Sequence, residues 1–149
     1  MRILVDGDAC PQKEEIAKLA KKYDVHLIVY MDYAHISYQE DYEVKQCEVG
    51  RDQVDMMIVN DVQKGDLVIT QDYGLATLIL AKKANVLHIN GMRIHQENID
   101  ELMFRRYVGQ KVRKANKHVN GPSKRTDDDK KYFLKQLELM IKEILMWDK

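Results

Sequence analysis

The sequence is short of the features that mark several large protein classes. Its two cysteines, Cys10 and Cys47, fall in no metal-ligand or redox spacing, so we expect structural thiols and exclude a disulfide framework. No apolar run approaches the roughly 18 residues needed to cross a bilayer, and we expect no contact with a membrane. The first residues read as a strand and lack the long apolar core of a signal peptide, which favours a cytoplasmic location.

An excess of charge of one sign is also lacking, because 24 Lys and Arg residues balance 24 Asp and Glu residues. The two signs are nevertheless separated along the chain. Between Asp32 and Asp66 there are nine acidic and three basic residues. Between Arg105 and Arg125 there are eight basic residues and no acidic one. This separation predicts an acidic and a basic region on the folded molecule.

What the sequence does contain is an alternation of strand and helix patterns. Short apolar runs rich in β-branched residues predict strands at about 2–6, 26–30, 43–48, 66–70 and 85–90, and none after residue 90. Apolar residues at helical spacing predict helices at about 11–22, 52–63, 75–83, from 96 to the mid-110s, and from 126 onward. Pro11 suits the first turn of the first helix. Thr126 and Asp129 form a capping box for the last.

Strands that alternate with helices predict βαβ units with right-handed crossovers. We therefore expect an α/β fold with a central parallel sheet of about five strands. One domain spans 1–149, and the two C-terminal helices, from about 96, pack on it. The last helix carries an apolar stripe, from Met140 to Trp147, which we assign first to the core and second to a possible homodimer contact.

Acidic residues recur where strands of this sheet end. Asp6 and Asp8 end the first strand, and Asp72 lies just beyond the strand at 66–70. Asp52 and Asp55 are three residues apart on a helix and project from nearly the same face. Because ligands of open parallel sheets bind beyond the carboxyl ends of the strands, we expect these carboxylates to meet in one cleft.

A cluster of carboxylates requires a counter-charge. Two carboxylates 4 Å apart repel by about 4 kcal/mol at an effective dielectric near 20. Oxygen ligands without a His or Cys cluster favour a hard cation, so the expected cofactor is Mg²⁺ or Mn²⁺. Such a metal commonly accepts a substrate phosphate, which is the setting of phosphodiester hydrolysis.

Three segments and the tail together carry a family resemblance. Val5-Asp6-Gly7-Asp8-Ala9-Cys10-Pro11, the segment 52–58 (DQVDMMI) and the segment 65–72 (GDLVITQD) resemble the bacterial YaiI/YqxD family. The tail, with Gly121-Pro122-Ser123-Lys124 and a helix start at 129–134, fits as well. The resemblance covers nearly the whole chain, in order and with fitting spacing.

The resemblance implies a PIN-like three-layer fold, with helices on both faces of the parallel sheet. PIN domains are typically metal-dependent ribonucleases whose acidic residues bind Mg²⁺ or Mn²⁺. The residues that match by position, as catalytic and metal-binding candidates, are Asp6, Asp8, Asp52, Asp55 and Asp72. Thr70 would be a small polar neighbour of Asp72. The chain departs from the family pattern at Gly74, where we expect proline, and at Met56, which replaces a second helical acid.

The basic stretch is a candidate substrate-binding surface. Basic residues interleaved with an aromatic side chain such as Tyr107 suit a phosphate backbone, which is held by charge and by stacking. The alternative is a solvated helix face that balances the acidic region. The residues proposed to bind substrate, beside Thr70, are Arg105, Arg106, Arg113, Lys114, Lys124 and Arg125.

These observations favour a metal-dependent nuclease that hydrolyses phosphodiester bonds, with RNA favoured over DNA as the partner. Two alternatives stay open. A non-catalytic nucleic-acid-binding or regulatory module would use the basic stretch and keep the acids only as remnants. A phosphatase for a small substrate would use Asp6 and Asp8 as an Asp-x-Asp pair, although the helical pair Asp52 and Asp55 fits this less well.

Overall fold

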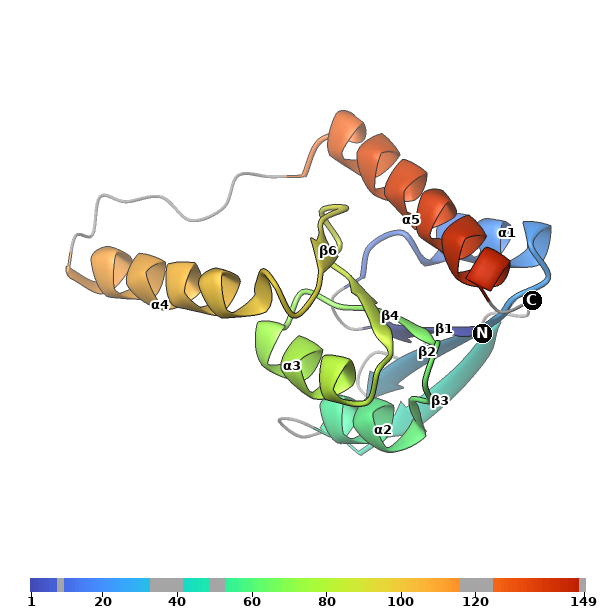
Figure 1. Cartoon of the computed structure of the whole chain (residues 1–149), viewed down its shortest axis with the longest axis horizontal. Coiled ribbons are helices and arrows are strands. Elements are labelled where there is room, and N and C mark those ends of the chain that lie inside the picture. Colours follow the sequence, from blue (N-terminus) through green and yellow to red (C-terminus); the bar gives the residue numbers. More distant parts are fainter. Residues whose placement is uncertain (8–9, 33–41, 49–52, 116–124, 148–149) are drawn as a thin grey trace.

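The computed structural model describes residues 1–7, 10–32, 42–48, 53–115 and 125–147, and the side chains of 113 and 115 are not described. The chain folds around one six-stranded sheet in the order β3-β2-β1-β4-β5-β6 (Figure 1). The strands are β1 (Arg2–Asp6), β2 (His26–Asp32), β3 (Glu43–Cys47), β4 (Leu67–Ile69), β5 (Asn85–Leu87) and β6 (Arg93–Ile94). The helices are α1 (Lys13–Lys22), α2 (Gln53–Asp61), α3 (Tyr73–Ala81), α4 (Ile99–Ala115) and α5 (Asp127–Trp147).

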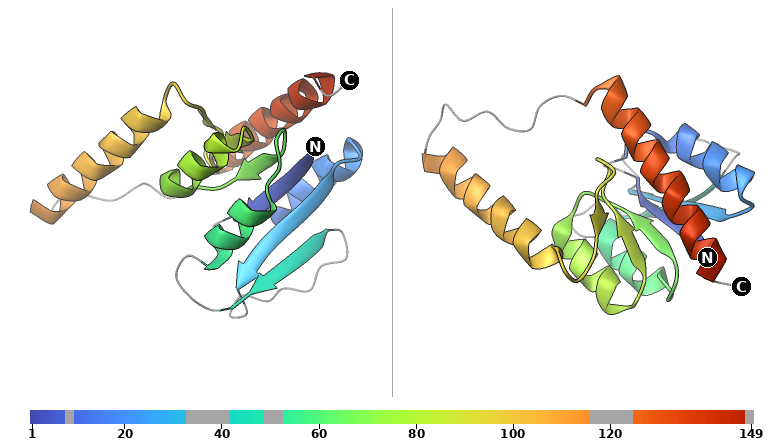
Figure 2. Two further views of the ribbon diagram at one scale, coloured as in Figure 1. Left: turned by 60° about the horizontal axis from the view of Figure 1, so that its bottom comes forward. Right: turned by 45° about the horizontal axis from the view of Figure 1, so that its top comes forward.

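The predicted α/β fold with a mostly parallel central sheet is confirmed. β1 to β5 pair in parallel, and only β6 runs antiparallel to β5. Successive residues of a strand point to opposite faces, and the core divides accordingly. Ile3 and Val5 pack with α1 and α5, whereas Leu4 packs with α2 and α3. Helices therefore cover both faces of the sheet (Figure 2).

Two expectations about the elements are wrong. Residues 93–94 form a sixth strand, which we had not expected because two residues are too few to give a pattern. Its turn is made possible by Gly91, which has a φ of +92° that side chains disfavour. Pro11 is not in the first turn of α1, because the helix begins at Lys13. Gln12 is the N-cap of α1; it is buried, and its side chain accepts a hydrogen bond from Arg125.

The two C-terminal helices lie in different surroundings. α5 packs beside α1 and buries Phe133, Leu137, Met140 and Ile141. Its capping box is present, since Thr126 N donates to Asp129 Oδ2 (2.8 Å) and Asp129 N donates to Thr126 Oγ1 (3.2 Å). α4 contacts α3 and extends away from the body of the molecule (Figures 1 and 2). Within the described residues, no helix is both long and apolar enough to cross a membrane.

Candidate active site

Asp6 lies at the point where the strand order of the sheet reverses. β1 sits between β2 and β4, so the chain winds outward on one side of β1 and then on the other. Val5 of β1 pairs with Ile69 of β4, which places Asp6 and Thr70 next to each other at the carboxyl edge. Open α/β sheets bind ligands in the crevice at such a switch point.

Gly7 makes the tight turn that follows Asp6. Its N–H donates to the carbonyl oxygen of Tyr30 at 2.8 Å. A Cβ on Gly7 would lie 2.6 Å from Val29 Cγ1 and 2.8 Å from that same carbonyl oxygen. Only glycine fits this close backbone approach, so the position of Asp6 is fixed by the backbone itself.

Thr70 links the two acids that follow neighbouring strands. Its hydroxyl donates to Asp6 Oδ2 at 3.2 Å and accepts from the backbone N–H of Asp72 at 3.1 Å. Asp6 is 8% exposed and Thr70 only 1%. The expectation that Thr70 lies beside Asp72 is confirmed. Its bond to Asp6 was not foreseen, and it joins the two candidate acids in one hydrogen-bonded unit.

Asp72 has a second role as the N-cap of α3. Its Oδ1 accepts from the N–H groups of Gly74 (2.9 Å) and Leu75 (3.2 Å). A proline at position 74 has no N–H and could not make the first of these bonds. The glycine therefore gives this chain an additional hydrogen bond that holds the Asp72 carboxylate.

Asp55 reaches the same region from α2. Asp55 and Asp72 both line a groove of about 720 Å³ between α2, α3 and the start of α4. The groove walls are mostly apolar, and Met56, in place of a second acid, is 58% exposed there. The helical acid and the acid after β4 are thus brought to one groove, whereas Asp6 is not among the residues that line it.

Asp8 and Asp52 lie outside the described residues. Within the described parts of the chain, no three His, Cys, Asp or Glu side chains gather closely enough to hold a metal ion. The available donors are nevertheless of the right kind, because the carboxylates of Asp6, Asp55 and Asp72 are the hard oxygen ligands that Mg²⁺ and Mn²⁺ prefer. A site at this edge would need one or both of the acids that the described residues leave out.

Two residues near Asp72, Tyr73 and His88, were missed by the sequence analysis, and both lie close to the predicted Arg106 or to each other. The ring of Tyr73 lies 5.6 Å from the ring of His88, and the Arg106 guanidinium lies 6.0 Å from the Tyr73 ring. His88 Nδ1 accepts from Asn90 N at 3.1 Å, which leaves the ring proton on Nε2. Burial, together with the charge of Arg125, lowers the pKa of His88. The position of His88 in the sequence could have revealed it. His88 directly follows β5, as Thr70 directly follows β4, and Asp6 ends β1.

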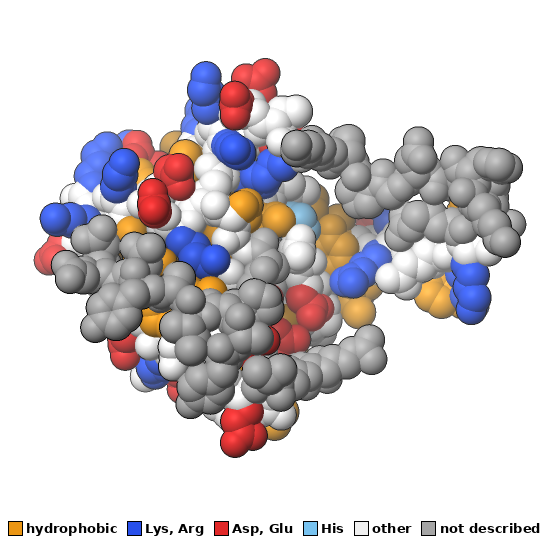
Figure 3. Space-filling view, turned by 180° about the vertical axis from the view of Figure 1, so that it is seen from behind, with side chains coloured by type: hydrophobic (Ala, Val, Ile, Leu, Met, Phe, Trp, Pro, Cys, Tyr) orange, Lys and Arg blue, Asp and Glu red, His pale blue; other side chains and the backbone are white. Residues whose placement is uncertain are grey.

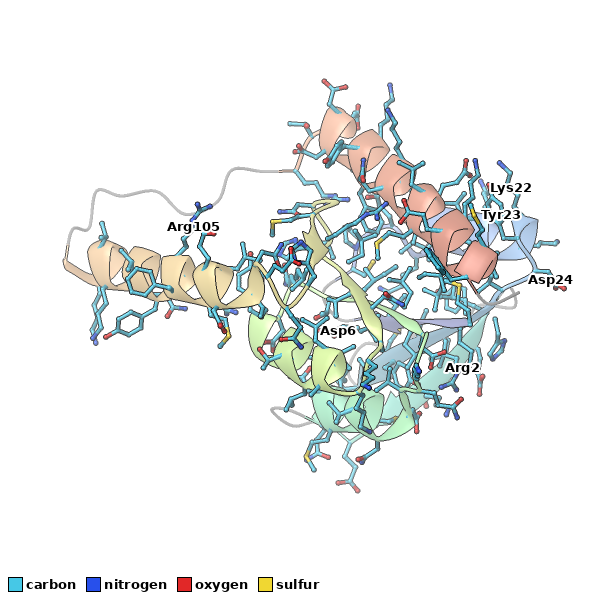
Figure 4. The ribbon with its side chains drawn as sticks, viewed as in Figure 1. Arg2, Asp6, Lys22, Tyr23, Asp24 and Arg105 are labelled. Atoms are coloured by element: carbon cyan, nitrogen blue, oxygen red, sulfur yellow. The ribbon has the colours of Figure 1, made fainter. Side chains whose placement is uncertain are left out.

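The basic candidates that the structure describes lie in two separate places. Arg105, Lys111 and Lys114 are exposed on α4, and Arg105 pairs with Glu101 at 2.5 Å. Figure 4 shows Asp6 in the middle of the molecule and Arg105 out on α4. Lys124 and the side chain of Arg113 are not described.

Arg125 is separated from the others and belongs to the body of the molecule. Its guanidinium donates to the carbonyl oxygen of Ile89 and to the side chain of Gln12, and lies 5.5 Å from the ring of Phe133. These contacts tie the start of α5 to the segments that follow β1 and β5. Arg125 therefore has a structural task as well as its predicted contact with substrate.

Comparison with known proteins shows the family of this chain. The model of the family described as "Uncharacterized BCR, YaiI/YqxD family" matches residues 4–143. The chain belongs to the YaiI/YqxD family. A UPF0178 protein of Natranaerobius thermophilus is 43% identical over 145 residues, which is 95% of this chain and 99% of that protein. A UPF0178 protein of Ruminiclostridium cellulolyticum is 44% identical over 142 residues, 95% of this chain and 93% of that one.

A solved structure also aligns with this YaiI/YqxD family member. The crystal structure of Rae1 (YacP) from Bacillus subtilis, W164L mutant, superposes with a TM-score of 0.46 and 19% identity. The alignment covers 94% of this chain and 91% of that chain.

Proposed function

We propose that the protein is a nuclease that hydrolyses phosphodiester bonds in RNA with the help of Mg²⁺ or Mn²⁺. The observation that carries the proposal is the hydrogen-bonded unit of Asp6, Thr70 and Asp72 at the switch point of the sheet. The buried Thr70 hydroxyl holds the Asp6 carboxylate and the backbone N–H of Asp72, and the start of α3 holds the Asp72 carboxylate. This arrangement suits a function that needs acids in fixed positions.

The surroundings of each residue suggest its role in the proposed reaction. Asp6 and Asp72, with Asp55 and the undescribed Asp8 and Asp52, would bind the cation through their oxygens. Thr70 would orient the Asp6 carboxylate and hold the backbone of Asp72 beside it. A metal held by these residues would activate a water for attack on the phosphorus and would offset charge on the leaving oxygen.

The exposed cations of α4 support a polyanionic substrate. Arg106 lies over Tyr73, the residue next to Asp72, so the first half of α4 adjoins the candidate site. Arg105, Lys111 and Lys114 continue along the helix as exposed cations. A phosphate backbone held along α4 would lead toward Asp72, as expected of positioning contacts to a nucleic acid.

The test is cleavage of a 5′-labelled single-stranded RNA in Mn²⁺ by the wild type and by an Asp6→Asn/Asp72→Asn variant. Asparagine caps helices as well as aspartate does, so the variant should keep α3 and lose only charge. We expect the rate to fall by more than about 100-fold, because lost metal ligands cost more than the roughly 10- to 100-fold of second-shell changes.

The matched control is Asp24→Asn. Asp24 is exposed at the edge of the molecule, away from Asp6 (Figure 4), and its φ of 55° suits asparagine equally well. It should cleave like the wild type. Wild-type cleavage by the double variant would refute the proposal. RNA binding that persists in EDTA, without cleavage in Mn²⁺, would instead favour the non-catalytic nucleic-acid-binding module.

A further inference from the structure

α4 exposes a set of large apolar side chains. Phe104 is 66% exposed, Tyr107 57%, Val108 40% and Val112 46%. Contiguous exposed apolar surface of this kind marks interaction sites in soluble proteins. Their spacing is helical, since Phe104, Val108 and Val112 follow one another at four-residue intervals along one side of the helix.

The body of the molecule already occupies the other side of α4. Ile99 is buried in the core, Thr77 Oγ1 donates to Met103 Sδ at 3.4 Å, and Arg106 lies over Tyr73. At 100° per residue, Arg106 lies about 160° around the helix from both Phe104 and Val108. The Phe104–Val108 side therefore cannot be covered by this chain's own α3.

The charges along α4 are arranged in opposite order at its two ends. Asp100 and Glu101 lie in the first turn, and Lys111 and Lys114 lie near the end. Two copies of such a helix in antiparallel orientation bring the acidic start of each beside the basic end of the other. A surface that is complementary to itself in this way is what a two-fold dimer requires.

We propose that α4 is a dimerisation helix whose exposed apolar side packs against α4 of a second copy, antiparallel. In the register that sets Phe104 opposite Val108 of the partner subunit, Glu101 stands opposite Lys111 of the partner subunit. The apolar pair and the charge pair are satisfied together. Figure 3 shows hydrophobic and basic side chains close together on the projecting part of the molecule.

The length of α4 suits a contact between two helices. The helix has 17 residues and spans about 25 Å, so its Phe104–Val112 side offers a partner helix more than two turns of apolar contact. The inference does not depend on the proposed nuclease activity.

The first test is the mass of the particle by sedimentation velocity, for the wild type and two variants. We expect a wild-type dimer at about 100 µM, and for Val108→Glu a dissociation constant at least about tenfold higher, because each copy would place an unpaired carboxylate in the apolar seam. The control, Met146→Glu, changes a residue that is 70% exposed on α5 and should leave the dimer intact.

Other outcomes would overturn the proposal. A wild type that is monomeric at that concentration leaves no dimer to explain. A dimer that survives Val108→Glu and dissociates in Met146→Glu would place the interface on α5. Both variants change exposed side chains, so circular dichroism should show native helix content in each.

A second experiment tests the register and does not rely on disrupting the protein. Cys10 and Cys47 are both buried, which leaves an introduced surface cysteine as the reactive thiol. An equimolar mixture of Phe104→Cys and Val108→Cys should form a disulfide-linked heterodimer under mild oxidation, faster than either variant links to itself. Equal rates in all three samples would reject the antiparallel register.

Discussion

The carboxyl edge of the sheet and α4 are neighbours with opposite design. At the edge, Asp6 and Thr70 are almost fully buried, and the Thr70 hydroxyl bonds both Asp6 and the backbone of Asp72. On α4, long side chains such as Phe104 and Lys111 are exposed and make few contacts with the body. The first region is built to hold atoms still, and the second to present them to another molecule.

The carboxyl edge has the rigidity that a reaction requires, and α4 has the exposed surface that recognition of another molecule requires. Reacting groups must be held within a fraction of an ångström, which requires rigid elements and packed neighbours. Binding surfaces tolerate mobile side chains, because charge and apolar area act over a broader range of geometries. Substitutions at the edge should therefore affect the stability of the fold, whereas substitutions on α4 should affect what the protein associates with.

The sharpest contrast is expected between Gly7→Ala and Gln110→Ala. The alanine Cβ at position 7 would press on Val29 and on the Tyr30 carbonyl, and overpacking of this kind costs about 1–3 kcal/mol. Gln110 is exposed on α4, and its change should stay within about 0.5 kcal/mol. Urea unfolding measures both, and equal midpoints for the two variants would show that the edge is less rigid than its contacts indicate.

A smaller contrast should separate two threonine-to-valine changes. Thr70→Val removes a buried hydroxyl that bonds Asp6 and the backbone N–H of Asp72, and leaving such groups unpaired costs about 1–3 kcal/mol. Thr77→Val removes an exposed hydroxyl that bonds the carbonyl of Tyr73 and should cost less than about 0.5 kcal/mol. Thermal unfolding compares the pair. A Thr70→Val variant as stable as Thr77→Val would mean that the bridge contributes little.

The smallest expected effect concerns acid stability. Burial alone would raise the pKa of Asp61, but hydrogen bonds from Lys45 (2.9 Å) and Tyr30 (2.9 Å) outweigh it and lower the pKa. A carboxyl with a lowered pKa in the folded state stabilises the fold above its unfolded pKa of about 3.9. That contribution is lost as the pH falls from about 5 through the folded pKa.

Melting temperature measured against pH checks this expectation. Asp61→Asn should flatten the fall below pH 5. Asp127→Asn, which changes a side chain 91% exposed on α5, should leave the wild-type profile unchanged. If both variants follow the wild type, the bonds of Asp61 add nothing to acid sensitivity.

Much of the fold could be predicted because the central strands β1, β2 and β4 are buried on both faces. Such strands read as nearly unbroken apolar runs, whereas the edge strand β3 carries only a mixed pattern. The position of Asp6 and Asp72 followed directly, since residues that come just after parallel strands share one edge. The two-residue β6 has no pattern of its own and is specified by its pairing with β5.

Contacts between residues distant in the sequence were beyond reach. Arg125 bonds Gln12 across 113 positions, and this contact places Arg125 in the body of the molecule, apart from the basic residues of α4. The neighbourhood of Tyr73, His88 and Arg106 likewise joins three elements. The sequence predicted α4 as a helix, but it did not predict that the apolar side of α4 faces away from the body. The spacing of apolar residues shows that a helix has an apolar side and does not show what that side packs against.

The strands at the two ends of the sheet bear on how copies of this protein meet. The edge strand β3 carries the polar residues Glu43, Lys45 and Gln46, and the edge strand β6 has only two residues. Charged or very short edge strands discourage the addition of a further strand from another molecule. The sheet is thus protected at both ends against the addition of strands from other copies. An association through α4 would end at two copies, because it uses no edge of the sheet.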